Sequence, residues 1–170
     1  MEGQLERAGD RWLLRFVRRL PHPPEKVWRA LTEPEHLAAW FPTEIHGERA
    51  TGARLRFVFP HGEGPTLEGE MVAYDPPRHL ELRWGDGEEL RFDLEPEGEG
   101  TVLTFVNTFD ELGKAARDAA GWHACLDLLA HRLAGEQPRG RPGERWSRVH
   151  AGYVERFPPE ASTIGPPNLP

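Results

Sequence analysis

The chain has 170 residues, which suits one domain of ordinary size and is too short for two comfortable ones. Its formal net charge of −7 repels a phosphate backbone over most of the surface, so we expect no nucleic-acid partner. The single cysteine excludes an intrachain disulfide, and no apolar stretch approaches the ~18 residues of a membrane span, so we expect a cytoplasmic protein without membrane insertion.

The chain begins with a predicted strand followed by two short helices. Residues 12–20 mix aromatic and branched side chains and end at a proline cluster, which indicates a strand stopped by proline. Pro24 suits the first turn of a helix, and residues 34–40 predict a second one. We interpret Trp28 and Trp40 as the anchors that dock these two helices.

From residue 54 onward, apolar side chains alternate with polar ones, which is typical of strands with one buried face. The alternation predicts strands over residues 55–59, 67–74, 79–84, 90–95 and 101–109. Glycine- and proline-rich turns join these segments, so we expect consecutive antiparallel hairpins that form a sheet with one dry face.

The longest segment with clear helical periodicity covers residues 121–133. One face of this helix carries the apolar side chains of Trp122, Cys125, Leu126, Leu129 and Leu133. We therefore expect the helix to cover the dry face of the sheet as a lid, with Cys125 as a buried structural thiol.

The opposite helical face carries His123, Asp127 and His131 at positions i, i+4 and i+8. This spacing could place three metal ligands in a row, but an exposed row lacks the supporting shell that metal sites need. We interpret the row as the solvated back of the lid. The chain has neither a zinc motif nor a glycine-rich nucleotide loop, so we expect no metal and no cofactor.

The C-terminal part of the chain follows a different pattern. Residues 146–157 predict a second amphipathic helix, whose packing partner is open. The predicted organisation is an N-terminal extension 1–11, a domain over 12–135, a linker 136–145, the helix 146–157 and an irregular tail 158–170.

The segment at residues 24–41 reads PEKVWRALTEPEHLAAWF and closely resembles the opening signature of the heat-shock-protein ATPase activator homologues. Later stretches agree with that family in order and spacing: residues 69–80, Trp84, and residues 121–122 followed by Leu126 and Leu129. The family belongs to the START-like, or SRPBCC, superfamily. The resemblance implies an α+β helix-grip fold, in which a curved antiparallel sheet wraps around a long C-terminal helix.

The resemblance also implies a cavity between sheet and helix that takes apolar or amphipathic small molecules. The candidate lining residues are Phe57, Phe59, Glu70, Trp84, Phe92, Phe105, Trp122, Leu126 and Leu129. The aromatic members could instead fill a solid core, and strand alternation could equally place Glu70 in solvent. Where the family often carries a histidine near the end of the last strand, this chain has Asn107-Thr108-Phe109.

The expected function is the binding of a small hydrophobic or amphipathic ligand in this cavity, with no catalytic residue required. A first alternative is a co-chaperone-like interaction module that regulates a heat-shock-protein ATPase, binding a chaperone or a second copy of the chain through the sheet or residues 146–157. A second is a cyclase- or hydrolase-type enzyme in which Glu70 or a histidine at the cavity rim, His46 or His61, acts as acid or base.

Overall fold

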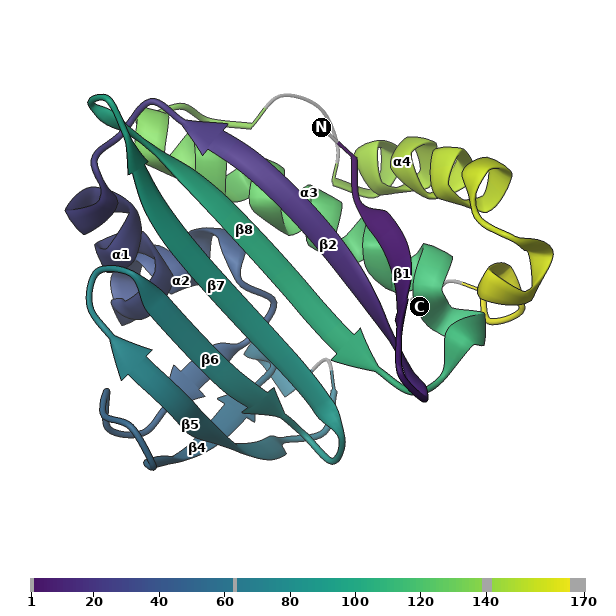
Figure 1. Ribbon diagram of the computed structural model, residues 1–170, viewed down its shortest axis with the longest axis horizontal. Coiled ribbons are helices and arrows are strands. Elements are labelled where there is room, and N and C mark those ends of the chain that lie inside the picture. Colours follow the sequence, from purple (N-terminus) through teal and green to yellow (C-terminus); the bar gives the residue numbers. More distant parts are fainter. Residues whose placement is uncertain (1, 63, 139–141, 166–170) are drawn as a thin grey trace.

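An eight-stranded antiparallel sheet wraps around one long helix (Figure 1). The computed structural model describes residues 2–62, 64–138 and 142–165. The strands are β1 (Gln4–Ala8), β2 (Arg11–Leu20), β3 (Glu44–His46), β4 (Arg54–Val58), β5 (Leu67–Asp75), β6 (His79–Trp84), β7 (Glu88–Glu97) and β8 (Gly100–Phe109). Their order is β1-β2-β8-β7-β6-β5-β4-β3, so the predicted hairpins form a meander from β3 to β8 and β2 pairs with β8. The predicted helix-grip fold is confirmed.

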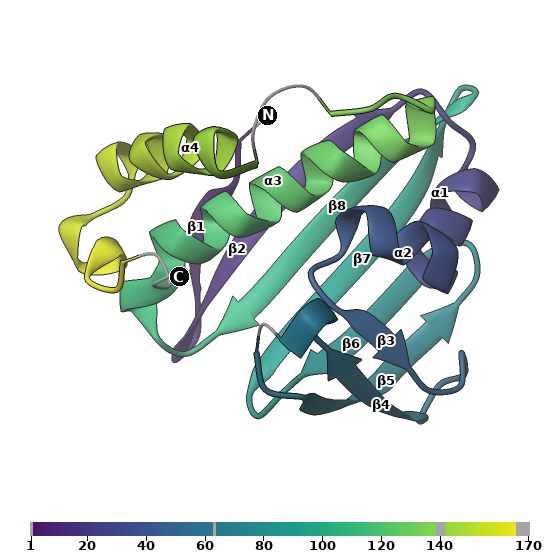
Figure 2. The same cartoon turned by 180° about the vertical axis from the view of Figure 1, so that it is seen from behind.

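The helices lie on the inner face of the sheet and around its edge. They are α1 (Pro24–Thr32), α2 (Pro34–Trp40), α3 (Ala115–Ala134) and α4 (Pro142–Arg156), with short 3-10 turns at η1 (Pro60–Gly62), η2 (Leu112–Lys114) and η3 (Pro159–Ser162). Figure 2 shows α3 crossing the sheet diagonally, with α1 and α2 on one side of it and α4 on the other. In the described part of the chain, no helix is long and apolar enough to cross a membrane.

The long helix α3 begins at Ala115, well before the predicted start at residue 121. The added turns contain four alanines, Ala115, Ala116, Ala119 and Ala120, and all four are fully buried. Alanine favours the helix but gives a weak amphipathic signal, so periodicity alone does not reveal this part of the helix. Because these side chains are small, the first turns of α3 can lie close to their neighbours.

The C-terminal end of α3 is held by α1 and by a glycine. The ammonium group of Lys26 in α1 donates a hydrogen bond to the carbonyl of Leu133 (2.9 Å), where the negative end of the helix dipole favours a cation. Gly135 has a left-handed backbone (φ 70°), and the N–H of Glu136 returns to the carbonyl of His131 (2.9 Å). These contacts end the helix at the edge of the sheet.

The two tryptophans predicted as anchors dock the short helices. The Trp28 ring lies 5.4 Å from that of Tyr74, centroid to centroid. The indole N–H of Trp40 donates to the carbonyl of Ala30 (2.8 Å), which ties α2 to α1. Both indoles are buried, so they combine apolar burial with a fixed orientation of the helices.

Residues 1–11 are predicted as an extension outside the sheet, but Gln4–Ala8 form the edge strand β1, paired antiparallel with β2. The strand β1 contains only one large apolar side chain, Leu5, so it lacks the alternation that identifies the other strands. The tight turn between β1 and β2 places it at the sheet edge.

The predicted C-terminal helix, α4, packs against α3, which is therefore its packing partner. Tyr153 of α4 is completely buried. The backbone N–H of Gly3 donates to the Tyr153 hydroxyl (2.7 Å), and the same hydroxyl is hydrogen-bonded to Nδ1 of His123 in α3 (2.8 Å). One hydroxyl thus joins the N-terminal segment, α3 and α4.

The row of His123, Asp127 and His131 is not the solvated back of a lid, because α4 and β2 cover part of it. Arg18 of β2 donates to the Asp127 carboxylate (2.8 Å), and His123 Nε2 lies 3.5 Å from the same carboxylate. Burial lowers the pKa of His123, although the Asp127 charge acts in the opposite direction. Across residues 2–62, 64–138 and 142–165, no group of three or more His, Cys, Asp or Glu side chains is arranged to hold a metal ion.

The first part of the predicted irregular tail packs back onto the domain. Ala161 in η3 is completely buried, and the backbone N–H of Ile164 donates to the carbonyl of Gly113 in η2 (3.0 Å). The rest of that tail, residues 166–170, and residues 139–141 of the predicted linker lie outside the described residues.

The substitution Tyr153→Phe tests the link among the three segments. It should lower the free energy of unfolding by about 1–3 kcal/mol, because the Gly3 N–H and His123 Nδ1 lose a buried partner. Urea denaturation measures this change. Tyr74→Phe is the matched control, since the Tyr74 hydroxyl makes no hydrogen bond to any other described residue. Equal stability of both variants would contradict the assignment.

Candidate functional site

A continuous aromatic cluster lies between the inner face of the sheet and α3. Trp84, at the end of β6, has its ring centroid 4.7 Å from that of Phe57 and 6.2 Å from that of Trp122 in α3. Trp122 in turn lies 4.9 Å from Phe105 of β8, which lies 4.8 Å from Phe92 of β7. The structure therefore brings together the predicted aromatic residues from four strands and the helix.

Most of the predicted lining residues form a packed core. Five of them are no more than 2% exposed: Phe57, Phe92, Phe105, Leu126 and Leu129. Phe59 follows β4 and is half-buried, with its ring 6.4 Å from that of Trp84. Trp84 and Trp122 are the two predicted residues that reach the pocket described below.

The prediction that Glu70 lies inside the cavity is wrong. Its neighbours Gly69 and Met71 are buried, and a Cβ atom at Gly69 would lie 2.7 Å from the Phe57 ring. Since successive side chains of a strand point to opposite faces, Glu70 lies on the outer face, where it is paired in register with Arg54 and Arg83. Acid–base chemistry in the cavity therefore cannot use Glu70.

A pocket of about 250 Å³ opens where the aromatic cluster meets the first half of α3. Its lining residues are Pro42, Trp84, Glu88, Lys114, Arg117, Asp118, Gly121, Trp122 and Cys125. The two indoles, the proline and the cysteine form an apolar wall, and four charged side chains form the other. Gly121 lies in the helical wall, and a Cβ atom there would have no neighbour within 4 Å.

The charged wall is an ion-pair network around Lys114. The ammonium group contacts the carboxylate of Glu88 and lies 3.2 Å from that of Asp118, one helical turn along the chain. Arg117 Nε donates to Asp118 (3.0 Å), while its two Nη groups make no hydrogen bond to another described residue. The Lys114 and Glu88 side chains are only 16% and 22% exposed, so this network is largely withdrawn from water.

Burial in the pocket wall shifts the proton affinities of these groups. Burial raises the pKa of Glu88 above its ordinary value, and the hydrogen bond from Lys114 offsets part of this. Burial alone would lower the pKa of Lys114, but the charge of Asp118 and the contact with Glu88 raise it. Burial of the sulfur raises the pKa of the Cys125 thiol to about 12, so this residue contributes apolar surface and no thiolate.

The four charged residues of the pocket are not predicted from the sequence: Glu88, Lys114, Arg117 and Asp118. The last three precede the periodic segment 121–133, and Glu88 lies next to a turn, so no pattern marks them. The available signal was the i, i+4 spacing of Lys114 and Asp118, which would suit an ion pair once α3 is known to begin earlier.

Asn107, near the end of β8, is almost completely buried on the inner face of that strand. Its amide nitrogen donates to the carbonyl of Glu89 (3.3 Å), while its Oδ1 atom has no hydrogen-bond partner among the described residues. A buried acceptor of this kind is uncommon, and it adds a polar spot to the otherwise apolar interior.

The pKa of Glu88 gives a direct test of the charged wall. Carbon-13 NMR titration of its carboxyl group should show a pKa above the ordinary value, and Lys114→Met should raise it further. Arg117→Met is the control and should change it less, because Arg117 is hydrogen-bonded to Asp118. The pKa of Glu88 is higher in the folded than in the unfolded chain, so its protonated form favours folding. This contribution to the free energy of unfolding is present at low pH and is lost as pH rises through the folded-state pKa. A Glu88 pKa at or below its ordinary value would contradict the geometry.

Solved structures with a similar fold cover most of the chain. CalU16 from Micromonospora echinospora is 20% identical, with a TM-score of 0.72 over 91% of this chain and 96% of that chain. The protein encoded by gene BPP1335 of Bordetella parapertussis is 27% identical, with a TM-score of 0.69 over 92% of this chain and 91% of that one. DynU16, described as a putative protein in the dynemicin biosynthetic locus, is 27% identical, with a TM-score of 0.64 over 73% of this chain and 48% of that one.

A family model described as "Activator of Hsp90 ATPase homolog 1-like protein" matches residues 21–134, from the approach to α1 through the end of α3. No curated protein matches the sequence significantly. The match spans both walls of the pocket and the aromatic cluster beneath it. The chain therefore belongs to the Activator of Hsp90 ATPase homolog 1-like family of START-like proteins.

Proposed function

We propose that this protein binds a small amphipathic molecule in the pocket between α3 and the β6–β7 hairpin. The observation that carries the proposal is the juxtaposition of two indoles, Trp84 and Trp122, with a partly desolvated charge network. Binding pockets for small molecules commonly combine an apolar wall with a few placed polar groups. The volume of about 250 Å³ suits a compact ligand or one end of a longer one.

The two walls of the pocket favour different parts of such a ligand. An aromatic or aliphatic part would lie against the indoles, where it loses contact with water. A polar or acidic group at the other end could accept hydrogen bonds from the free Nη groups of Arg117. Lys114 is already bound to two carboxylates, so its main role is to hold that wall in place.

The similarity to DynU16 supports a small-molecule ligand, since that protein is described as coming from a biosynthetic locus. The fold and family are also compatible with a cyclase-type enzyme in the same cavity. Of the predicted acids and bases, Glu70 and His46 lie on the outer face and His61 is exposed in η1, so the pocket carboxylate Glu88 is the candidate acid or base for such an enzyme.

Fewer structural observations support the co-chaperone-like alternative. Three apolar residues of α4 and the residue that follows it pack in or against the protein's own core: Trp146, Val149, Tyr153 and Phe157. Capture of a chaperone or a second copy through these residues would require α4 to undock. We therefore favour the pocket over the helix as the functional surface.

The substitution Gly121→Leu tests the proposed function. The new side chain should occupy the pocket without colliding with the fold, because the position is open. Binding of the apolar fluorescent probe anilinonaphthalene sulfonate, followed by its fluorescence, should weaken about tenfold or more, since the leucine takes the space against the indoles. The helix should keep or gain stability, because glycine costs about 1 kcal/mol relative to leucine in a helix interior.

Gly152→Leu is the matched control, because this position in α4 is equally open and lies away from the pocket. Thermal unfolding should show both variants folded, and only Gly121→Leu should lose the probe. Absence of probe binding to the unaltered protein, or equal loss in both variants, would contradict the proposal.

A further inference from the structure

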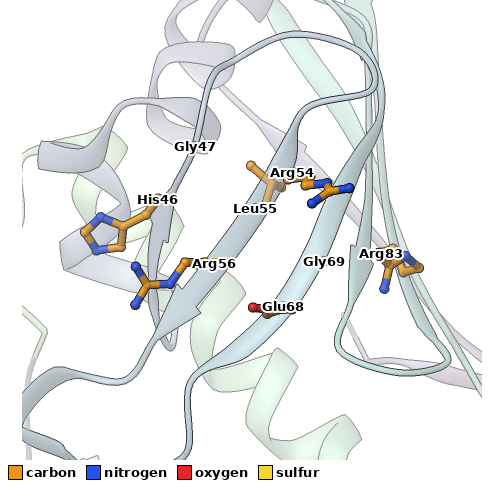
Figure 3. A pocket seen from close by; sticks show the side chains of 8 residues that line it. All are labelled: His46, Gly47, Arg54, Leu55, Arg56, Glu68, Gly69 and Arg83. Atoms are coloured by element: carbon orange, nitrogen blue, oxygen red, sulfur yellow. The ribbon is translucent and has the colours of Figure 1, made fainter.

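A second hollow, of about 550 Å³, lies on the outer face of the sheet over β3, β4, β5 and β6. Figure 3 shows Arg54, Arg56 and Glu68 on the neighbouring strands β4 and β5, with His46 on one side and Arg83 on the other. The buried residues of β4 face the aromatic cluster, so the arginines between them face away from it. The hollow is therefore separated from the pocket beside α3 by the sheet itself.

Two glycines fix the backbone that frames this hollow. At Gly47 (φ 142°) a Cβ atom would lie 2.5 Å from the carbonyl oxygen of Arg54, and at Gly69 it would lie 1.9 Å from that of Arg83. Both distances are too short for any side chain. Close backbone approach at these positions sets where Arg54 and Arg83 stand, so the hollow is framed by ordered strands.

The arginines of the hollow lack the ion pairs that the arginines of β2 and β7 make. Each of the four arginines of β2 and Arg91 of β7 lies within 4.0 Å of a carboxylate. By contrast, Arg54 and Arg56 make no hydrogen bond or ion pair with any described residue, and Arg83 donates only to the carbonyl of Gly85 (3.2 Å). Among the described residues, most donors of these three guanidinium groups therefore have no hydrogen-bond partner.

This absence of pairing is informative because carboxylates are available nearby. Glu68 is in register with Arg56, and Glu70 with Arg54, yet within the described residues neither pair closes to ion-pair distance. Among the described residues, Glu68 is the one carboxylate that lines the hollow, against three arginines, and His46 at its side is hydrogen-bonded to Glu44 (3.0 Å). In a chain with a net charge of −7, this is a local excess of positive charge.

We propose that the outer hollow binds a small anion that carries two or more phosphate or carboxylate groups. Guanidinium groups bind phosphate groups and carboxylate groups alike through paired, charge-assisted hydrogen bonds. Arg54 and Arg56 stand two residues apart on one strand face, about 7 Å along the strand, so they can hold two anionic groups of one molecule. The volume is that of a small-molecule site.

Isothermal titration calorimetry at low salt tests the proposal with two probes, inorganic pyrophosphate and citrate. Saturable binding of either supports it, and the preferred probe distinguishes phosphate from carboxylate recognition. The double variant Arg54→Gln/Arg56→Gln should weaken binding about tenfold or more, as expected for the loss of charged hydrogen bonds. Both arginines are exposed, so this variant should fold.

The matched control is Arg15→Gln/Arg19→Gln, which removes two charges from the outer face of β2. It should leave binding nearly unchanged, whereas Glu68→Gln should tighten it by removing the repelling carboxylate. The proposal is overturned if neither probe binds, if the control weakens binding as much as the double variant, or if Glu68→Gln weakens it. All of these outcomes are independent of ligand binding beside α3.

Discussion

The fold depends on the burial of one face of α3 against the inner face of the sheet. Trp122, Leu126 and Leu129 of the helix meet apolar side chains from the strands, and transfer of that surface from water supplies the dominant stabilising free energy. The other elements hold α3 in this position: Lys26 of α1 at its C-terminal end, Tyr153 of α4 on its side and the chain around Ile164 near its beginning. The position of the candidate pocket depends on how completely side chains fill the space between α3 and the sheet.

Filling is uneven along α3, and this unevenness creates the candidate site. Over its second half, Leu126, Leu129 and Leu133 are almost completely buried and belong to the packed core. Near its first half, Gly121 contributes no side chain to the pocket, which is lined beside the indoles by charged groups from the start of the helix and by Glu88 of β7. Burial raises the pKa of Glu88, so its ionised carboxylate costs stability, whereas the neighbouring carboxylates raise the pKa of Lys114 and so favour its charged form. A shifted carboxylate beside an apolar pocket marks a candidate functional site.

The parts of the fold that follow from local periodicity could be predicted from the sequence. Strand alternation identified the sheet from residue 54 onward, and the apolar stripe of residues 121–133 identified the inner face of the lid. Elements defined by tertiary pairing could not be found this way: β1, with one large apolar residue, and the alanine-rich start of α3. The pocket charges were missed for the same reason, since Glu88 and Lys114 meet only in the folded chain. For Glu70 the sequence leaves both faces of the strand open, and the burial of Gly69 and Met71 in the structure assigns it to the outer face.

The most direct test of the central claim is to locate an apolar ligand on the protein. Intermolecular nuclear Overhauser effects between anilinonaphthalene sulfonate and the folded chain would do so. We expect contacts from the probe's rings to the indole protons of Trp84 and Trp122. Contacts confined to the separate groove lined by Leu5, Trp12 and Phe157 would contradict the account, because that groove lies at the sheet edge, away from the pocket beside α3.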